Sequence, residues 1–518
     1  MEQKEKNLNW LYMKKINNRI LIATLALVSL FAGCSKEYLD VNNDPNRTTD
    51  ENITPDLLFT QAATAAGYRT IGTAIGGEGA KTELQYAQNW VGYMAGTGDF
   101  AVEQIETTYN IDFAFGDNSW QRDYGVLFDL HLTKTKALEA GNKVLAGAAM
   151  ILSAKMFQDI TDTYGDVPYS QAFQTDVYKH PAYDKAQDVY NALQLSLDSA
   201  ITYMSEEEGP ASFATVDVVN HGDQVKWIKF ANTLKLRMLL RQSEVSGFDP
   251  SAEITKIEAH GGVLEAGESV SVNPGFTNAQ SKQSPFYGNY GFTPTGNKAA
   301  GGWAPNNYIL NILLSTNDPR IERFFTTVGG FFVGCDYGLV TGNPFQAQAS
   351  YFGPGVARSA DQDQWLIPSF ESMFFKAEAI ARGWITDQGT AEDAFDAAIT
   401  ESFVWLGVDD AETAAADYIA SNDIANWANA GSTPEEQAKF VVFQKYIALT
   451  CIDPREAWAD QRRLYFLPEG FISVNPSRLE DQLPLRLLYP QSEYTTNNES
   501  VSAVGTINQF TTKIFWEP

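Results

Sequence analysis

The feature that most constrains this chain is a single apolar run, Ile20–Phe31, that ends shortly before Cys34. The run is twelve residues long. A membrane-spanning helix needs about 20 apolar residues, so the run is too short to cross a bilayer. Basic residues precede it, and two small residues, Ala32 and Gly33, follow it, which is typical of a secretory signal peptide. The basic segment is long, so Met13 is an alternative start. No later run approaches the length of a membrane span, and we expect one large body outside the bilayer.

The three residues before the expected new N-terminus, read together with Cys34 as FAGC, resemble the lipobox of bacterial lipoproteins. The resemblance implies that residues 1–33 are a signal peptide and that the Cys34 thiol is acylated, for example with palmitate. Residues 34–54 then form a short acidic tether. Phe31 departs from the box, where leucine is usual. The alternative is an ordinary secretory peptide in which Cys34 has no special role.

The charge balance excludes one class of partner. The chain has 64 acidic and 37 basic residues and a net charge of −27, and the leader is itself basic. So acidic a body repels nucleic-acid phosphates, and we expect no nucleic-acid partner. Anionic lipid headgroups repel it too, so it needs a covalent anchor to stay at a membrane. Cys335 and Cys451 are too far apart in sequence to suggest a disulfide framework or a metal knuckle.

The tether contains a spacing that mimics a calcium-binding loop. Its oxygen-bearing residues are Asp40, Asn42, Asp44, Asn46 and Glu51. Pro45 stands where such a loop needs glycine, and no helix precedes it. A turn is therefore favoured over a calcium site, and we expect no metal or other cofactor.

Helical periodicity recurs through most of the chain. Thr54 before Pro55 predicts a helix start, and Gly141-Asn142 predicts a turn between antiparallel helices. Helices are expected at about 55–66, 84–95, 120–140, 143–160, 184–204, 224–241, 368–382, 391–406, 434–451 and 454–463. Long antiparallel pairs indicate an all-α, tetratricopeptide-like scaffold, although no clean repeat is found. The basic residues of 224–241 are expected on a solvated or ion-paired face.

The predicted body, 55–518, divides into two kinds of structure. The helical scaffold occupies about 55–245 and 365–465. A loop-rich, irregular part at about 261–360 is dense in Gly, Asn, Pro and aromatic residues. Loops of that length inside a domain are usually functional, so we expect this part to carry the ligand site. A short edge strand is expected at 511–516.

Catalytic motifs are not found. The four histidines are scattered, and the sequence has no HExxH, G-x-S-x-G or Cys-His signature. A glycoside hydrolase needs only two carboxylates, so 64 acidic residues leave that class open.

The loops combine aromatic faces with amides and carboxylates, which is how proteins hold sugars. Binding is expected from the loops at 97–120 and 281–306, and Trp303 and Tyr290 of the second loop are the leading candidates for stacking against a sugar ring. The other candidates are Tyr287, Asn289, Phe292, Asp99, Phe100 and Tyr109. The alternative for each aromatic is that it only pins its loop to the body.

Several segments together resemble the SusD/RagB family of outer-membrane nutrient-binding lipoproteins, in its SusD-like branch. They lie in the family's order along almost the whole chain after the leader. They are FAGCSKEYLDVNNDPN at 31–46, YGDVPYSQAF at 164–173, WIKFANTLKLRMLLR at 227–241, FFKAEAIARGW at 374–384 and LPLRLLYPQSEYTTN at 483–497.

The resemblance implies a fold, a place and a partner. The fold would be a helical tetratricopeptide-like scaffold whose irregular part holds the ligand. The protein would be lipid-anchored, face outward from the outer membrane, and serve polysaccharide utilisation. It would bind an oligosaccharide without catalysis and deliver it to a SusC-like TonB-dependent transporter. Peptide binding, a purely structural lid for the transporter, and a surface glycoside hydrolase are the alternatives.

Overall fold

The computed structural model describes Trp10 and residues 13–16, 53–77, 84–467 and 471–518. The chain divides into two units, residues 1–53 and 54–518. In the first unit, Trp10 and residues 13–16 are helical. Cys34, the predicted cut and the calcium-like spacing lie outside the described residues.

The second unit is built mainly from helices, and the predicted all-α class is confirmed. Its first helices are α2 (Pro55–Arg69), α3 (Gln85–Trp90), α4 (Gln104–Thr107), α5 (Asp117–Glu139), α6 (Lys143–Tyr164), α7 (Ala186–Glu206), α8 (Phe213–Val216), α9 (Gln224–Arg241) and α10 (Ser251–Ala259). The loop-rich part contains α11 (Pro285–Tyr290), α12 (Asn307–Ser315) and α13 (Ile321–Phe324). The last helices are α14 (Ser369–Ala381), α15 (Ala391–Leu406), α16 (Ala411–Ser421), α17 (Pro434–Ala448), α18 (Pro454–Leu464), α19 (Gln491–Thr496) and α20 (Asn498–Ala503), with a 3₁₀ turn at Trp427–Asn429.

Local chemistry explains where these helices begin and end. The Thr54 hydroxyl accepts a hydrogen bond from the Leu57 N–H, which confirms the predicted cap of α2. Gly141, at φ +74°, makes the turn between α5 and α6, a conformation that residues with a Cβ rarely adopt. Thr433 and Glu436 form a reciprocal capping box at the start of α17.

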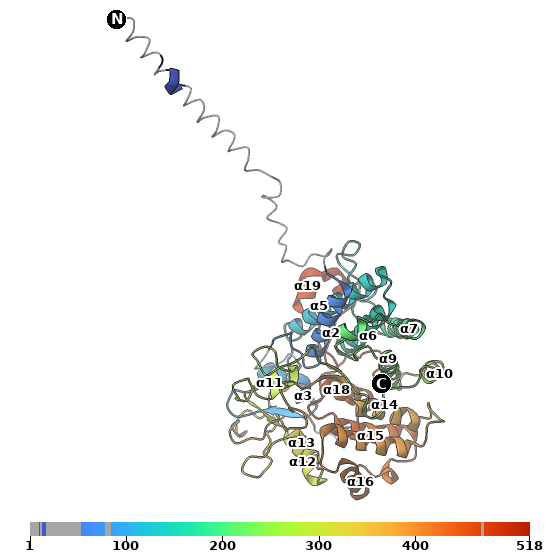
Figure 1. Ribbon diagram of the computed structural model, residues 1–518. Coiled ribbons are helices and arrows are strands. Elements are labelled where there is room, and N and C mark those ends of the chain that lie inside the picture. Colours follow the sequence, from blue (N-terminus) through green and yellow to red (C-terminus); the bar gives the residue numbers. More distant parts are fainter. Residues whose placement is uncertain (1–9, 11–12, 17–52, 78–83, 468–470) are drawn as a thin grey trace. The chain divides into compact units, whose positions relative to one another are not determined.

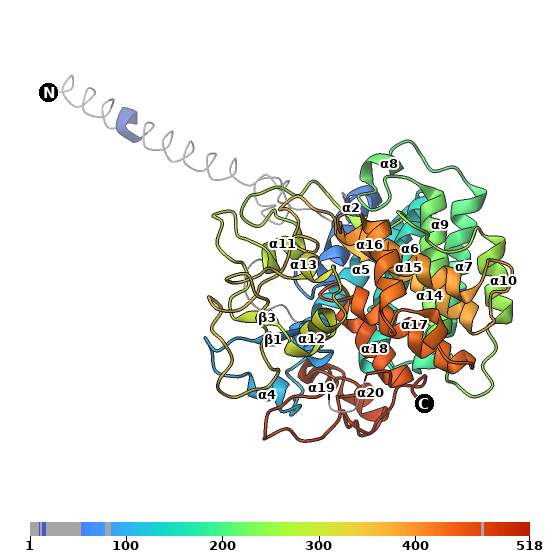
Figure 2. The same ribbon diagram turned by 90° about the horizontal axis from the view of Figure 1, so that it is seen from below.

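The helices pack as a continuous series. α2 contacts α5, α5 contacts α6, α6 contacts α7, and α7 contacts α9. α9 then contacts α14, which packs on α15 and α17. Figure 2 shows α7, α9, α14 and α17 on one side of this unit, and α4, α11, α12, β1 and β3 on the other; in Figure 1, α11 likewise lies on the side away from α7 and α9. The loop-rich part therefore lies beside the helical part.

Among the described residues, α6 alone is long and apolar enough to cross a membrane by length and composition. Of its apolar window, 89% is buried inside the protein. α6 is therefore the central core helix of the series.

Two short antiparallel sheets tie the loops to the scaffold. β1 (Met94–Gly96) pairs with β3 (Trp303–Pro305), and Gly96 lies opposite Trp303. β2 (Val270–Val272) pairs with β4 (Gln364–Ile367), with a bulge at Val270/Ser271. Each sheet joins a segment before or within the loop-rich part to one far away in sequence.

Several predicted elements differ from the structure. The helix expected at 84–95 ends at Trp90, because Gly92 turns the chain at φ +80° and 94–96 pair as β1. α10, α12 and α16 were not predicted. The edge strand expected at 511–516 is wrong: this segment is irregular and buries Trp516 instead.

A buried ionic cluster joins the two halves of the helical series. Its members are Asp159, Asp162, Arg237, Arg241, Glu378, Lys445, Arg455, Glu456, Asp460 and Arg463, all at most 6% exposed apart from Arg455. The basic residues of α9 were expected to be solvated or ion-paired; Arg237 and Arg241 are ion-paired but fully buried.

Glu456 is the centre of the ionic cluster. Its carboxylate accepts hydrogen bonds from Arg237 Nε at 2.8 Å, Arg241 Nη2 at 2.5 Å and Lys445 Nζ at 2.9 Å. Burial alone would raise the pKa of Glu456, but the charges of Arg241, Lys445 and Arg237 together hold it well below its ordinary value. Nearby Glu371, buried with no described hydrogen-bond partner for its carboxyl oxygens, has a pKa raised well above its ordinary value by burial, with Asp453 and Glu456 adding to it.

Replacing Glu456 with glutamine removes the shared negative charge and leaves three buried cations undercompensated. Breaking a buried pair from one side costs about 3–5 kcal/mol, so we expect the free energy of unfolding in urea to fall by about that amount. The matched control is Glu435→Gln, which breaks the exposed pair with Lys439 on α17 and should cost less than about 1 kcal/mol. Equal losses for the two variants would contradict a structural role for the ionic cluster.

Candidate functional site

A cavity of about 1030 Å³ opens in the loop-rich part. Three segments line it, at 96–107, 299–303 and 337–345, together with Asn89 of α3. Its volume matches the range of small-molecule sites, so it is the candidate ligand site of this chain.

The β1–β3 pairing holds the first two segments together. Just beyond the pair, the Thr97 N–H donates to the Gly302 carbonyl at 2.9 Å. Gly302 has φ +82°, and a Cβ there would lie 2.6 Å from the Phe100 ring. The absence of a side chain at Gly302 therefore lets the Phe100 ring lie against the backbone beside Trp303.

Asp99 connects the first segment to the third. Its carboxylate accepts hydrogen bonds from the Thr97 hydroxyl at 2.6 Å and the Gln346 N–H at 2.5 Å. The hydrogen bond from Thr97 has the larger effect on the pKa of Asp99 and the bond from Gln346 the smaller one, and both hold that pKa below its ordinary value. Asp99 is thus an ionised, fixed group in the wall.

Asn343 fixes the third segment in the same way. Its side-chain amide donates to the carbonyls of Gly96, at 3.0 Å, and Asp336, at 2.9 Å, and accepts from the Asp336 N–H. The Gly98 N–H also donates to the Pro344 carbonyl at 2.8 Å. The wall is therefore held by backbone and amide hydrogen bonds rather than by flexible side chains alone.

Buried polar groups form the base of the cavity. The Asn89 amide donates to the Glu106 carboxylate at 2.6 Å, and the Tyr337 hydroxyl donates to the Glu106 carbonyl at 3.0 Å. All three residues are at most 7% exposed. They join α3, α4 and the third segment at one point.

The rim is apolar and exposed. Phe100 is 68% exposed, Phe345 55% and Val340 49%, while Trp303 is half-buried. Monomeric proteins seldom leave aromatic rings exposed around one hollow without a binding role. Flat ring faces next to carboxylates and threonines can hold a ligand with both C–H faces and hydroxyl groups.

The ionisable carboxyl and basic groups of the described lining are all carboxyl groups. Asp99, Glu103 and Glu106 line the cavity, and its described lining contains no Lys, Arg or His. Lys298 is the cation whose charge acts on Asp99, and it lies outside the lining, over the Tyr351 ring at 4.6 Å.

Of the predicted site residues, the structure brings Asp99, Phe100 and Trp303 together in this lining. Tyr290 is instead 4% exposed and packs on Phe286 and Phe352 in the core.

The remaining predicted residues also lie outside the cavity lining. The Asn289 amide, 3% exposed, donates to the carbonyls of Gly77 and Pro285. Tyr109 is fully buried, and its hydroxyl accepts from the Ser473 N–H at 2.7 Å. Tyr287 and Phe292 are half-buried, and their rings pack against each other.

The third segment was missed as a part of the site. Tyr337, Val340 and Phe345 lie in the loop-rich part, but no local pattern separates them from other aromatic and apolar residues there. The Asn343-Pro344 turn was the one available signal, and it indicated only a loop.

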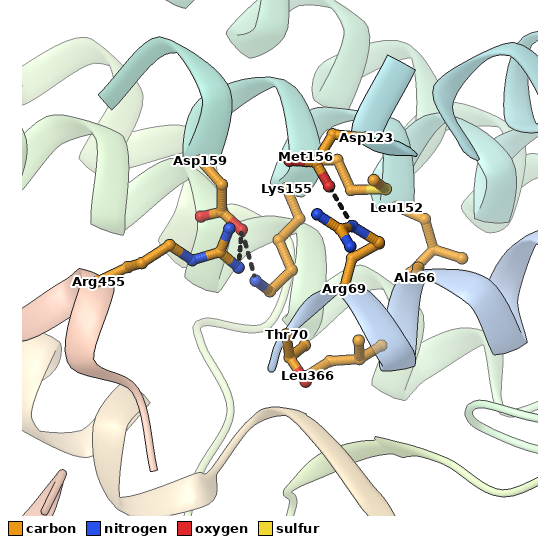
Figure 3. A pocket seen from close by; sticks show the side chains of 10 residues that line it. All are labelled: Ala66, Arg69, Thr70, Asp123, Leu152, Lys155, Met156, Asp159, Leu366 and Arg455. Carbon is orange, nitrogen blue, oxygen red and sulfur yellow. Dashed lines mark hydrogen bonds and ion pairs between the residues drawn. The ribbon is translucent and has the colours of Figure 1, made fainter. Parts of the chain in front are cut away.

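A second, very small pocket lies between α2, α5, α6 and α18 (Figure 3). It measures about 10 Å³, near the minimum for one water, so a sugar ring does not fit. Figure 3 shows Asp159 between Lys155 and Arg455, at 3.0 and 3.2 Å. This pocket is the edge of the ionic cluster.

Three carboxyl groups with raised pKa values lie outside the large cavity. A glycosidase needs a carboxylic acid with a raised pKa as its proton donor. Burial raises the pKa of Asp396 to about 6 and that of Glu517 to about 7, but both lie outside the cavity, as does Glu371. No group of three or more potential metal ligands occurs within the described residues.

Comparison with solved structures agrees with this architecture. A SusD homologue from Bacteroides fragilis NCTC 9343 matches with a TM-score of 0.72 at 19% identity, covering 90% of this chain and 99% of that one. A SusD/RagB family protein from Bacteroides thetaiotaomicron VPI-5482 matches with a TM-score of 0.71 at 23% identity, over 90% and 99% of the two chains. A chitin-binding SusD homologue from Flavobacterium johnsoniae matches with a TM-score of 0.70 at 23% identity, over 88% and 98%. A search of curated protein sequences finds no match.

At these identities the structures establish the fold, which is the helical, tetratricopeptide-like fold of SusD homologues. The sequence itself matches one family over residues 45–490, which is most of the chain. This protein belongs to the SusD-like family, described as starch-binding and associating with the outer membrane.

Proposed function

We propose that this chain is a surface lipoprotein that binds an oligosaccharide in the large cavity, without catalysis. The observation that carries the proposal is the set of aromatic faces, Trp303, Phe100 and Phe345, around a hollow of about 1030 Å³. A pyranose ring presents an apolar C–H face that packs on such rings, and its hydroxyls need polar partners nearby. Asp99, Glu103 and the backbone of the fixed walls supply acceptors.

The family and one relative support a glycan as the ligand. The family is described as starch-binding, and the Flavobacterium johnsoniae homologue as chitin-binding. Starch and chitin oligomers are therefore the first ligands to test.

We further propose the layout expected from the sequence. Residues 1–33 are a signal peptide, Cys34 carries the lipid, 34–54 are a tether, and 55–518 are the binding body. Delivery to a SusC-like TonB-dependent transporter in the outer membrane follows from the resemblance to SusD/RagB proteins. A peptide ligand, or a lid with no ligand of its own, would be favoured by a screen in which no glycan binds.

Replacing Trp303 with alanine removes the stacking face next to β1, and Phe100→Ala removes the exposed ring beside it. For each variant we expect at least a tenfold loss of affinity for the best-binding starch or chitin oligomer, which is about 1.4 kcal/mol. Isothermal titration calorimetry measures this loss. Phe331→Ala is the matched control, because Phe331 is a 72% exposed ring in the loop-rich part outside the lining. Affinity unchanged in both cavity variants would refute this site.

The one-sided charge of the lining predicts discrimination against anionic glycans. Asp99, Glu103 and Glu106 repel carboxylate or sulfate groups in the cavity. We therefore expect oligosaccharides that contain uronic acid or sulfate to bind at least tenfold more weakly than neutral ones of equal length. The difference should shrink as salt is added, because ions screen the repulsion. Tighter binding of the anionic oligomer at low salt is the opposite result and would rule this prediction out.

Replacing Cys34 with serine removes the proposed site of acylation. We expect the variant to lose labelling by a clickable palmitate analogue and to move from the membrane fraction to the soluble fraction of fractionated cells. Cys451→Ser is the control, because Cys451 is buried in the core and should leave labelling unchanged. Labelling retained by Cys34→Ser would show that the lipid is attached elsewhere.

A further inference from the structure

A third cavity, of about 230 Å³, lies on the helical part of the protein. It is formed by α5, α6, α7 and the turn at 169–174, and it shares no lining residue with the large cavity. The turn belongs to the YGDVPYSQAF segment, to which the glycan-binding proposal assigns no role.

The turn that forms one wall is fixed in place. The Asp184 carboxylate accepts hydrogen bonds from the N–H groups of Tyr169, at 3.0 Å, and Ser170, at 2.8 Å. It also accepts from the Ser170 hydroxyl at 2.7 Å. The carboxylate of Asp184 thus fixes the turn through three hydrogen bonds, and Asp184 is not part of the cavity lining.

Phe173, at the end of the turn, has an unusual backbone conformation. Its φ is +65°, which is strained for a bulky residue and persists only where the surroundings enforce it. In this conformation its ring lies 5.4 Å from the His131 ring and 6.3 Å from the Phe157 ring. Phe157 in turn packs edge-on against Tyr169 at 4.8 Å. This backbone conformation therefore places the Phe173 ring beside His131, next to the rings of Phe157 and Tyr169.

The titratable side chains of this cavity that can carry a positive charge are His131 and Lys134. His131 and Lys134 lie one turn apart on α5, which places them on the same face of the helix. Both are half-buried, and no described acidic residue contributes to the pKa shift of either. Burial lowers the pKa of Lys134, and burial together with the charge of Lys134 lowers the pKa of His131.

No Asp or Glu is present among the lining residues, although the chain has 64 acidic and 37 basic residues. A half-buried cation without a partner is unfavourable, and proteins normally pair such groups. An anion bound from solution would supply the missing partner. Ser153 and Ser196 lie in the same lining and offer hydroxyl donors to it.

We propose that this third cavity binds a small organic anion. Its charged group pairs with Lys134 and accepts a hydrogen bond from the His131 ring, while its apolar part packs on Phe157, Tyr169 and Phe173. The chemical class is a phosphate, sulfate or carboxylate attached to a ring or a short apolar chain. The site differs from the large cavity in place and in charge, so one protein would carry a neutral glycan and an anion at separate sites.

Calorimetric titration of the full chain with phenyl phosphate tests the proposal, with benzyl alcohol as the uncharged counterpart. We expect saturable binding of one phenyl phosphate per chain and no saturable binding of benzyl alcohol. Lys134→Met should weaken phenyl phosphate binding at least tenfold, and His131→Gln should weaken it to a smaller degree. Lys439→Met removes the same charge on distant α17, and Trp303→Ala alters only the large cavity; both should leave binding unchanged.

The melting temperature of each variant shows whether a loss of binding comes from misfolding instead of from the lost side chain. Lys134→Met removes an uncompensated cation, so it should melt at or above the temperature of the unaltered chain. Absence of saturable phenyl phosphate binding at millimolar concentrations, or undiminished binding by a folded Lys134→Met variant, would overturn the anion site.

Discussion

The buried carboxylate of Glu456 is the interaction on which the rest of the structure depends. It lies in the first turn of α18 and accepts hydrogen bonds from Arg237 and Arg241 of α9 and from Lys445 of α17. Each of these charges would be costly to bury alone, and each is tolerated because the others are present. The three helices must therefore assemble in one register, since a slipped arrangement would leave a charge unpaired in the core. In this way the ionic cluster joins the N-terminal and C-terminal halves of the helical series.

The same helix, α18, also contacts the helix that leads into the candidate ligand site. Trp458 of α18 packs on Trp90 at a ring distance of 5.5 Å, and Trp90 is the last residue of α3. α3 supplies Asn89 to the base of the large cavity and leads directly into β1, whose Gly96 pairs with Trp303. The helical scaffold thus determines where the loops of the candidate site lie. Hydrogen bonds from Asn343 and to Asp99 then fix the outer walls, so the cavity is largely formed before a ligand arrives.

The two larger cavities differ in the charge of their lining residues, and this difference underlies the two different ligands proposed for them. The large cavity has carboxylates in its lining and aromatic rings at its rim, which suits a neutral, hydroxyl-rich molecule. The smaller cavity on the helical part has His131 and Lys134 without an acidic residue in its lining. In so acidic a protein, the local sign of charge near a cavity is more informative than the net charge.

The sequence by itself determined the helical class, most helix boundaries and the family, and it predicted a ligand site in the loop-rich part. The helical class and the helix boundaries follow from local physics, because periodicity, caps such as Thr54 and breakers such as Gly141 act within a few residues. The family followed instead from the resemblance of five segments to SusD/RagB proteins. It also named Asp99, Phe100 and Trp303, which the structure brings together in the lining of the large cavity. Only the tertiary structure decided that Tyr109, Asn289 and Tyr290 are buried, and that Tyr337, Val340 and Phe345 complete the cavity. Burial and proximity depend on which distant segments meet, as β1 and β3 do, and no local pattern carries that information.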